Sequence, residues 1–303
     1  MKQTAEIINF CGKYCIKILV NKPIAPYTSF KIGGNCNILK ADGISSLHRI
    51  LQFCQKREIP YKILGGGSNV LISDDGLDEV VILLSGSEFT ETFVDGEAIF
   101  SGAGVKLSEV CKVALEHGLT GLEFAYGIPG TVGGALYMNA GAFGGDMSQV
   151  VSFCDCYTLR RRNFRLHTEE MQLSYRHSVF AENPDWIITK VVFALQKGDP
   201  AAIKARMDEI SAARVDKQPL DLPSAGSTFK RPEGYFAAKL IEDCGLKGRS
   251  VGGAMVSTKH SGFVVNTGAA TFADVTSLIE IVKEEVRAKT GVELECEVQI
   301  WNS

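Results

Sequence analysis

GGGSN at residues 65–69 and GIPGTVGGA at residues 127–135 are the two stretches that decide the fold of this chain. Glycine permits φ > 0 and lets backbone N–H groups approach an anion with no Cβ in the way. Two such loops, with Asn69 and Asn139 beside them, indicate a two-sided clamp for the diphosphate of a bound nucleotide. A pair of tight turns without a ligand is the alternative explanation.

The spacing of these loops excludes two common nucleotide-binding motifs. The first loop lies between apolar runs at 61–64 and 70–72, as a turn that leaves a strand does. A G-x-G-x-x-G fingerprint counted from Gly65 would need glycine where Val70 stands, and no loop ends in Gly-Lys-Ser/Thr. The two loops alone leave NAD, FAD and nucleoside triphosphates as candidates.

The composition is that of a globular protein without a strong charge field. The 303 residues suffice for two or three domains, with 45% hydrophobic and 22% charged residues. The net charge of -3 and the pI near 6.0 give no reason to expect nucleic acid or an anionic membrane as a partner. We expect the basic run at 160–162 to be a solvated strand end.

The lack of a recognisable targeting signal and the pattern of cysteines predict a cytoplasmic protein. Lys13 and Lys17 interrupt the N-terminal apolar residues, so this segment lacks the apolar core of a signal peptide, and no stretch has the length of a membrane span. The nine cysteines are odd in number and mostly lie in apolar patterns, which favours reduced thiols. We expect no metal site, because the pairs 154/156 and 11/15 lack C-x-x-C spacing and a nearby histidine.

Hydrophobic periodicity predicts an α+β fold. We expect helices at 45–57 and 106–117 and strands at 61–64, 70–72, 80–84, 98–101, 150–159 and 186–195. Gly198-Asp199-Pro200 indicates a domain boundary and starts a helix that ends by Pro219. Further helices are predicted at 235–244 and 271–291, the latter with a capping box at 271–274. The alternating run at 292–300 predicts a half-buried strand.

Seven motifs, which include the two glycine segments, follow one another along the chain. They are YTSFKIGG at 27–34, the two glycine segments with NAG at 139–141, YR at 175–176, KQP at 217–219, AGS at 225–227 and EV at 297–298. Together they resemble the UDP-N-acetylenolpyruvoylglucosamine reductase (MurB) family over nearly the whole chain beyond residue 25. The short stretch between Arg176 and Trp186 resembles the shorter, type II subclass.

The resemblance implies a fold and an activity. It implies a two-subdomain FAD-binding domain of the vanillyl-alcohol-oxidase and p-cresol-methylhydroxylase (PCMH) type at 28–197, and we expect the N-terminal segment at 1–27, which the resemblance does not explain, to be helical. An α+β substrate-binding domain follows at 198–303. The implied cofactors are FAD and NADPH, and the implied partner is a UDP-sugar whose enolpyruvyl ether is reduced in peptidoglycan precursor synthesis. We expect a monomer or weak homo-oligomer, with no nucleic-acid or membrane partner.

The resemblance also assigns three catalytic residues. Arg176 would stabilise the charge that develops on the substrate carboxylate, since a guanidinium is planar and permanently charged. Glu297 would donate a hydrogen bond as the protonated acid, with a raised pKa, because its anion would repel that carboxylate. Ser227 would deliver a proton to the carbon next to the carboxylate. A surface arginine and a turn serine are the structural alternatives.

The remaining site residues follow from the same resemblance. Those expected to bind the cofactor are Gly65, Gly66, Gly67, Ser68, Asn69, Gly127, Ile128, Pro129, Gly130, Thr131, Gly133, Gly134, Ala135, Asn139, Ala140, Gly141 and Arg214. Those expected to bind the substrate are Tyr175, Lys230, Lys259 and His260. Gln299 departs from the family, which often has arginine there. An FAD oxidase of the same fold and a flavin-binding protein without catalysis remain as alternatives.

Overall fold

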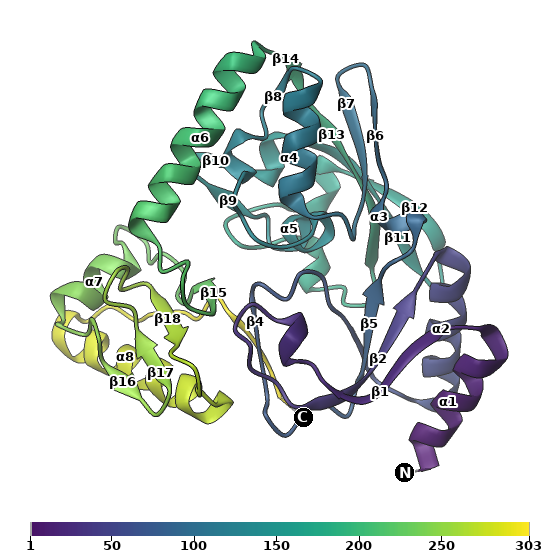
Figure 1. Ribbon diagram of the computed structural model, residues 1–303, viewed down its shortest axis with the longest axis horizontal. Helices are drawn as coiled ribbons and strands as arrows, with labels where there is room; N and C mark the ends of the chain where they lie inside the picture. Colours follow the sequence, from purple (N-terminus) through teal and green to yellow (C-terminus); the bar gives the residue numbers. More distant parts are fainter. Residues whose placement is uncertain (1, 303) are drawn as a thin grey trace. The chain divides into compact units, whose positions relative to one another are not determined.

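The computed structural model describes residues 2–302, which form two compact units. Unit 1 comprises residues 2–20, Asn37–Gly66 and Glu79–Ala213. Unit 2 comprises Asn21–Cys36, Gly67–Asp78 and residues 214–302. Figure 1 labels the elements of both units. The units differ from the predicted domains, because residues 28–36 and 67–78 belong to the same unit as the last third of the chain.

A four-stranded sheet begins unit 1, in the order β1 (Lys17–Pro23), β2 (Asn35–Ala41), β5 (Val80–Leu84), β3 (Tyr61–Ile63). β2 and β3 both run parallel to β5. The helices α1 (Lys2–Tyr14) and α2 (Ile44–Arg57) join its core through Ile7 and Leu47, and the rings of Phe10 and Phe53 stack at 4.2 Å. The predicted N-terminal helix is therefore present as α1. The helix does not continue beyond it, because the residues of β1 pair in the sheet.

An antiparallel five-stranded sheet forms the larger part of unit 1. Its order is β12 (Arg162–His167), β11 (Val151–Thr158), β13 (Ile187–Ala194), β7 (Ala98–Gly102), β6 (Thr92–Asp95). The helices α4 (Leu107–Glu116) and α5 (Val132–Tyr137) contribute Val110, Val132 and Leu136 to a core shared with Val191 and Phe193. This packing places the segment 127–135 against the sheet, because α5 is its last part.

Unit 2 contains a second antiparallel sheet, in the order β15 (Ser224–Ser227), β18 (Phe263–Asn266), β17 (Ala254–Val256), β16 (Ser250–Val251). The helices α7 (Ala237–Asp243) and α8 (Phe272–Thr290) share its core, together with Phe30, Ile32 and Leu71. A parallel pair, β4 (Val70–Ile72) with β19 (Gln299–Trp301), brings the end of the chain beside the first glycine loop. The YTSFKIGG motif is thus part of this unit's packing.

Most of the predicted elements are confirmed. The helix α8 begins at Thr271, whose Oγ1 accepts the Asp274 N–H while the Asp274 carboxylate accepts the Thr271 N–H, and it ends at Gly291 with φ 75°. The helix α6 (Pro200–Lys217) starts after Asp199, whose carboxylate accepts the Ala201 N–H at 3.1 Å. The shorter elements are α3 (Ser87–Thr90), β8 (Leu119–Thr120), β9 (Gly141–Ala142), β10 (Gly145–Asp146) and β14 (Gln196–Lys197).

The strand predicted at 292–300 is wrong over most of its length. Leu294 and Val298 are buried as the alternation requires, but only Gln299–Trp301 forms a strand. The preceding segment makes a single bridge, Phe229 with Cys296, because it lies beside a short stretch after β15 and not beside a full strand. Over residues 2–302, no helix has the length and apolar character that crossing a membrane requires.

Candidate functional site

The two glycine-rich segments meet within unit 1. A Cβ added to Gly66 would lie 2.5 Å from Gly130 Cα, and one added to Gly65 would lie 2.6 Å from Thr131 Oγ1. Any larger residue at Gly66 would therefore push the two backbones apart. Both Gly65 and Gly66 are exposed, so their peptide groups border solvent beside the second segment. This cradle, which a Cβ would fill, fits a diphosphate held through the main chain.

The second segment is fixed to the sheet of unit 1. The Val132 and Gly133 N–H groups donate to the carbonyls of Val105 and Ala103, at 2.9 and 2.8 Å. Thr131 caps α5, since its Oγ1 accepts the Gly134 N–H at 3.5 Å. These bonds hold the segment in place without using its exposed surface at Gly127 and Pro129.

Gly67 continues the first loop into unit 2. Its φ is 61°, and a Cβ there would lie 2.1 Å from the Tyr27 carbonyl oxygen. The Gly67 carbonyl accepts both the N–H and the Oγ of Ser29, at 2.9 and 3.3 Å. The Ser29 hydroxyl also lies 2.6 Å from the Ser224 carbonyl in β15. The loop is thereby connected, through Ser29, to the strand that carries Ser227.

Asn139 organises the loop after α5. Its side chain is buried, its φ is 40°, and its Nδ2 donates to the Ser174 carbonyl at 2.9 Å. Its Oδ1 accepts the Ser148 N–H at 3.0 Å. Both ends of the amide are engaged by backbone groups, so the side chain sets the positions of two neighbouring loops.

Arg176 follows directly after the segment that Asn139 holds. Its backbone has φ 55°, and its guanidinium donates to the Gly141 carbonyl at 3.1 Å while lying 5.1 Å from the centre of the Tyr175 ring. Ser174 and His177 exchange backbone hydrogen bonds around it. The structure therefore brings the predicted catalytic arginine to the predicted cofactor segment 139–141. Tyr175 is 52% exposed.

Ser227 and Glu297 lie on adjacent segments of unit 2. Ser227 ends β15 opposite Phe263, after Gly226 with φ 77°. The next residue, Thr228, donates its N–H to the Gly262 carbonyl and accepts the Glu297 N–H, both at 2.8 Å. The Glu297 carbonyl also accepts Asn69 Nδ2 at 3.1 Å. The two predicted catalytic residues are thus connected through one backbone hydrogen bond.

The predicted cationic residues have partners within the protein. Lys230 Nζ lies 3.0 Å from the Glu295 carboxylate, and Lys259 Nζ donates to the Val215 carbonyl at 2.6 Å, near the end of α6. Burial lowers the pKa of the Arg214 guanidinium. Burial also lowers the pKa of His260, whose Nδ1 accepts the Gly262 N–H at 3.2 Å. His260 is therefore neutral near pH 7, with its proton on Nε2.

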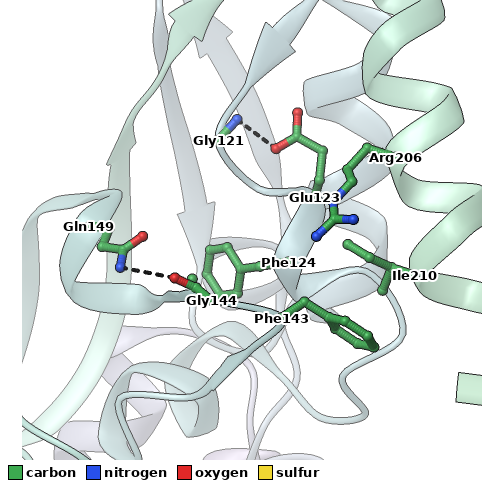
Figure 2. A pocket seen from close by; sticks show the side chains of 9 residues that line it. Gly121, Glu123, Phe124, Phe143, Gly144, Gln149, Arg206 and Ile210 are labelled. Atoms are coloured by element: carbon green, nitrogen blue, oxygen red, sulfur yellow. Dashed lines mark hydrogen bonds between the residues drawn. The ribbon is translucent and has the colours of Figure 1, made fainter. Parts of the chain in front are cut away.

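An open pocket in unit 1 lies apart from these residues. Figure 2 shows Phe143 and Gly144 of the β9–β10 loop, with Arg206 and Ile210 of α6 on its other side. Glu123 accepts the Gly121 N–H at 2.9 Å, and Gln149 donates to the Gly144 carbonyl at 3.5 Å (Figure 2). No residue predicted to bind cofactor or substrate lines this pocket. It is therefore a different feature from the glycine cradle.

The cysteines of the described residues are free thiols. Cys154 and Cys156 lie in β11 with their Sγ atoms 3.5 Å apart, and the hydrogen bond between them, together with burial, raises the pKa of Cys156. Within residues 2–302, His, Cys, Asp and Glu side chains nowhere gather in threes in a way that could hold a metal ion.

Two family models match separate parts of the chain. Residues 38–158 match the model of an FAD binding domain, and residues 218–301 match the C-terminal domain of UDP-N-acetylenolpyruvoylglucosamine reductase. The chain is 47% identical over 285 residues to the reductase of that name from Caldanaerobacter subterraneus subsp. tengcongensis, covering 94% of this chain and 93% of the relative. The chain belongs to the UDP-N-acetylenolpyruvoylglucosamine reductase family.

Two further relatives of this reductase family agree. The reductase from Clostridium novyi is 49% identical over 275 residues, which covers 90% of this chain and 89% of that protein. The crystal structure of the reductase (MurB) from Thermus caldophilus has a TM-score of 0.81 and 33% identity, covering 95% of this chain and 99% of that one. The chain is therefore an oxidoreductase with a PCMH-type FAD-binding domain, and its length is that of the shorter subclass.

Three supporting residues escaped the sequence-based prediction. Ser29 was noted only as part of a motif, and Ser148 and Ser174 were not considered, although each holds a segment that carries a predicted site residue. Ser148 and Ser174 act here through backbone groups, which carry no signal in the residue type. Ser29 lies within the motif YTSFKIGG, and this position is the one available signal.

Proposed function

We propose that this protein reduces UDP-N-acetylglucosamine enolpyruvate to UDP-N-acetylmuramate, with NADPH as reductant and FAD as cofactor, in cytoplasmic peptidoglycan precursor synthesis. The observation that carries the proposal is the arrangement of Ser227 and Glu297, whose segments are joined by the Thr228–Glu297 hydrogen bond. Family membership supports the substrate, because the relatives bear the name of this reductase.

The residues proposed to bind the cofactor are the exposed glycines of the two loops. FAD, when bound, supplies the hydride chemistry. Gly65, Gly66 and the segment from Gly127 would hold its diphosphate through backbone N–H groups, since the close approach of Gly66 and Gly130 leaves main chain at the surface. Arg214, with its partly buried and permanently charged guanidinium, is proposed to offset negative charge near the flavin.

Arg176 and Glu297 are proposed to stabilise the charge that forms on the substrate. Addition of hydride to the enolpyruvyl double bond moves negative charge onto the carboxylate, and fixed donors there lower the barrier. The Arg176 guanidinium is held at the Gly141 carbonyl, which fixes the permanently charged planar group beside the predicted cofactor segment 139–141. Glu297 would act as a protonated donor, because an ionised carboxylate would repel the substrate.

Ser227 is proposed to protonate the carbon next to the carboxylate. The hydroxyl is a weak acid, but an enolate is a strong base, so proton transfer from a positioned serine is feasible. Ser227 lies at the end of β15, directly before the backbone bonds of Thr228 to Gly262 and Glu297. These bonds hold its backbone in one place, which general acid catalysis requires.

The residues proposed to bind the substrate differ in the contacts that they make within the protein. Tyr175 is exposed and lies against Arg176, which suits a group that contacts a substrate. Lys230 and Lys259 would have to exchange their contacts with Glu295 and the Val215 carbonyl for a UDP phosphate. His260 would act as a neutral donor, because its pKa is lowered by burial.

Product analysis tests this proposal. The purified protein, NADPH and the enolpyruvyl substrate should give a product heavier by two hydrogen atoms, with one NADPH consumed for each product molecule. An oxidase of the same fold, the alternative function, would instead form hydrogen peroxide from oxygen without NADPH. Unchanged substrate after complete flavin loading would contradict the proposed function.

A further inference from the structure

Asn69, the last residue of the first glycine loop, makes two hydrogen bonds to the segment that contains Glu297. Its side-chain Nδ2 donates to the Glu297 carbonyl at 3.1 Å, and its own carbonyl accepts the Gln299 N–H at 3.0 Å. These two bonds flank Val298, which is buried in the core of unit 2. All of these residues belong to unit 2. Asn69 therefore brackets the residue next to the predicted catalytic glutamate.

We propose that Asn69 is a positioning residue that fixes the backbone position of Glu297. This position therefore depends on whether the glycine loop at 65–69 is ordered. The inference rests on the proposed function, since it takes Glu297 to act on the substrate. It departs from the sequence-based expectation that Asn69 is a cofactor ligand, because the side-chain amide donates to the protein itself.

The two bonds of Asn69 have different consequences. The bond from Gln299 uses the Asn69 backbone and belongs to the start of the parallel pair β4–β19, so it survives substitution. The side-chain bond to Glu297 does not. Together with the bond from the Glu297 N–H to Thr228, it holds both peptide groups of the glutamate. Substituting Asn69 therefore loosens Glu297 while leaving the strand pairing in place.

The glycine loop connects Asn69 to the proposed cofactor site. Residues 65–69 are consecutive, and Gly65 and Gly66 form the cradle with Gly130 and Thr131. A ligand that orders this loop also orders Asn69, and through its two bonds the backbone at 297 and 299. Binding of FAD to the apoprotein should accordingly slow hydrogen exchange of the Gln299 amide, which donates to Asn69.

The experiment compares Asn69→Ala and Asn69→Asp with the wild type in separate half-reactions. Anaerobic reduction of the bound flavin by NADPH should stay within about twofold, because Glu297 has no role there. Reoxidation by the enolpyruvyl substrate should slow about tenfold in Asn69→Ala, the loss expected for one hydrogen bond. Asn69→Asp should be slower still, because its carboxylate would face the Glu297 carbonyl.

A matched control separates positioning from loss of stability. Asn266 is another asparagine of unit 2 whose Nδ2 donates to a backbone carbonyl, that of Phe30, at 3.1 Å, and it is buried, whereas Asn69 is partly exposed. Asn266→Ala should destabilise the protein without slowing reoxidation selectively. FAD titration of the apoproteins gives each variant's affinity, and all rates are measured at saturating FAD. Gln299 amide exchange then reports on the segment without any turnover.

A double-mutant cycle gives the deciding outcome. If Asn69 acts through Glu297, adding Asn69→Ala to Glu297→Ala, which removes the donor, should slow reoxidation by less than about twofold, and the two effects should not add. Full additivity, or rates restored to wild type by excess FAD, would overturn the proposal and leave Asn69 as a cofactor ligand. Equal slowing of both half-reactions would also overturn it. Failure of the wild type to reduce the substrate would instead contradict the proposed function.

Discussion

Arg176 in unit 1 and the pair Ser227 and Glu297 in unit 2 are held by different kinds of interaction. Arg176 lies in the left-handed region of the backbone, in a loop fixed by the Asn139 side chain and by its own bond to Gly141. Ser227 and Glu297 lie beside each other along backbone hydrogen bonds, through Thr228. The first arrangement depends on single side chains, whereas the second follows from strand geometry.

This difference predicts how each unit responds to substitution. In unit 2, removing a catalytic side chain should leave the backbone in place, so the loss is chemical and the fold is retained. In unit 1, removing a supporting side chain should move the catalytic residue and lower stability together. The variants below separate these two responses.

Ser227→Ala should have the largest effect. Loss of the proton donor should slow substrate reduction by a factor of about 10²–10⁴, the range for general acid catalysis, while NADPH still bleaches the flavin. The unfolding free energy should change little, because the Ser227 backbone bonds remain. Rapid-mixing absorbance at the flavin band measures both half-reactions. Ser250→Ala, at an exposed serine of β16, is the control, and normal substrate reduction by Ser227→Ala would contradict its role as the acid.

Arg176→Ala should rank second. Removal of one fixed donor for the developing charge costs a factor of about 10²–10³ in turnover. Arg176→Lys should recover part of the rate, since it keeps the charge but not the planar fork. Steady-state kinetics with the enolpyruvyl substrate measures this. Arg206→Ala serves as the control in the same unit, and an unimpaired Arg176→Ala would return this residue to the role of a surface arginine.

Asn139→Ala should have an intermediate effect that combines activity and stability. It removes two hydrogen bonds, although the Ser174 carbonyl keeps the His177 N–H and the Ser148 N–H keeps the Asp146 carboxylate; losing two bonds costs about 1–3 kcal/mol of unfolding free energy. Turnover should fall because Arg176 follows Ser174 closely in the chain. Urea denaturation and kinetics on the same sample measure both quantities. Loss of FAD affinity alone, with wild-type stability, would show that Asn139 binds the cofactor directly.

His260 should give the smallest effect, a change in the pH dependence of stability. Burial lowers its pKa in the folded protein, so below its unfolded pKa of about 6.5 the unfolded chain binds the proton more readily. Its contribution to stability is therefore present at higher pH and is lost as the pH falls through the unfolded pKa. Denaturation of His260→Gln between pH 5 and 8 should show a shallower loss on the acid side. His117→Gln, at an exposed histidine, should match the wild-type slope.

The sequence contained enough to predict the helices, the glycine loops and the family, because periodicity, capping residues and glycine spacing are local signals. The capping box at Thr271 is an example, since both of its hydrogen bonds lie within four residues. The strand at 292–300 was overpredicted because its burial alternates but its hydrogen-bond partners lie far away, at Asn69 and Thr228. The positive φ of Arg176 could not be predicted from the residue type.

The same contrast holds within the candidate site. The positions of Gly65, Gly66 and Gly130 were predicted, and their close contact explains why glycine is needed. The internal bonds of Asn69, Asn139, Lys230 and Lys259 were not predicted, because a polar side chain in a motif is equally compatible with a ligand and with a protein partner. The protein partners of these side chains are contacts between residues distant in sequence, which the motifs alone do not reveal.

An anaerobic flavin titration of the wild-type protein shows whether electrons pass from NADPH to the enolpyruvyl substrate. We expect that the protein binds FAD, that NADPH bleaches its visible absorbance, and that the substrate restores the absorbance without oxygen, one equivalent for each flavin. A flavin that stays bleached with the substrate and recovers only when oxygen is admitted would contradict the proposed reductase activity.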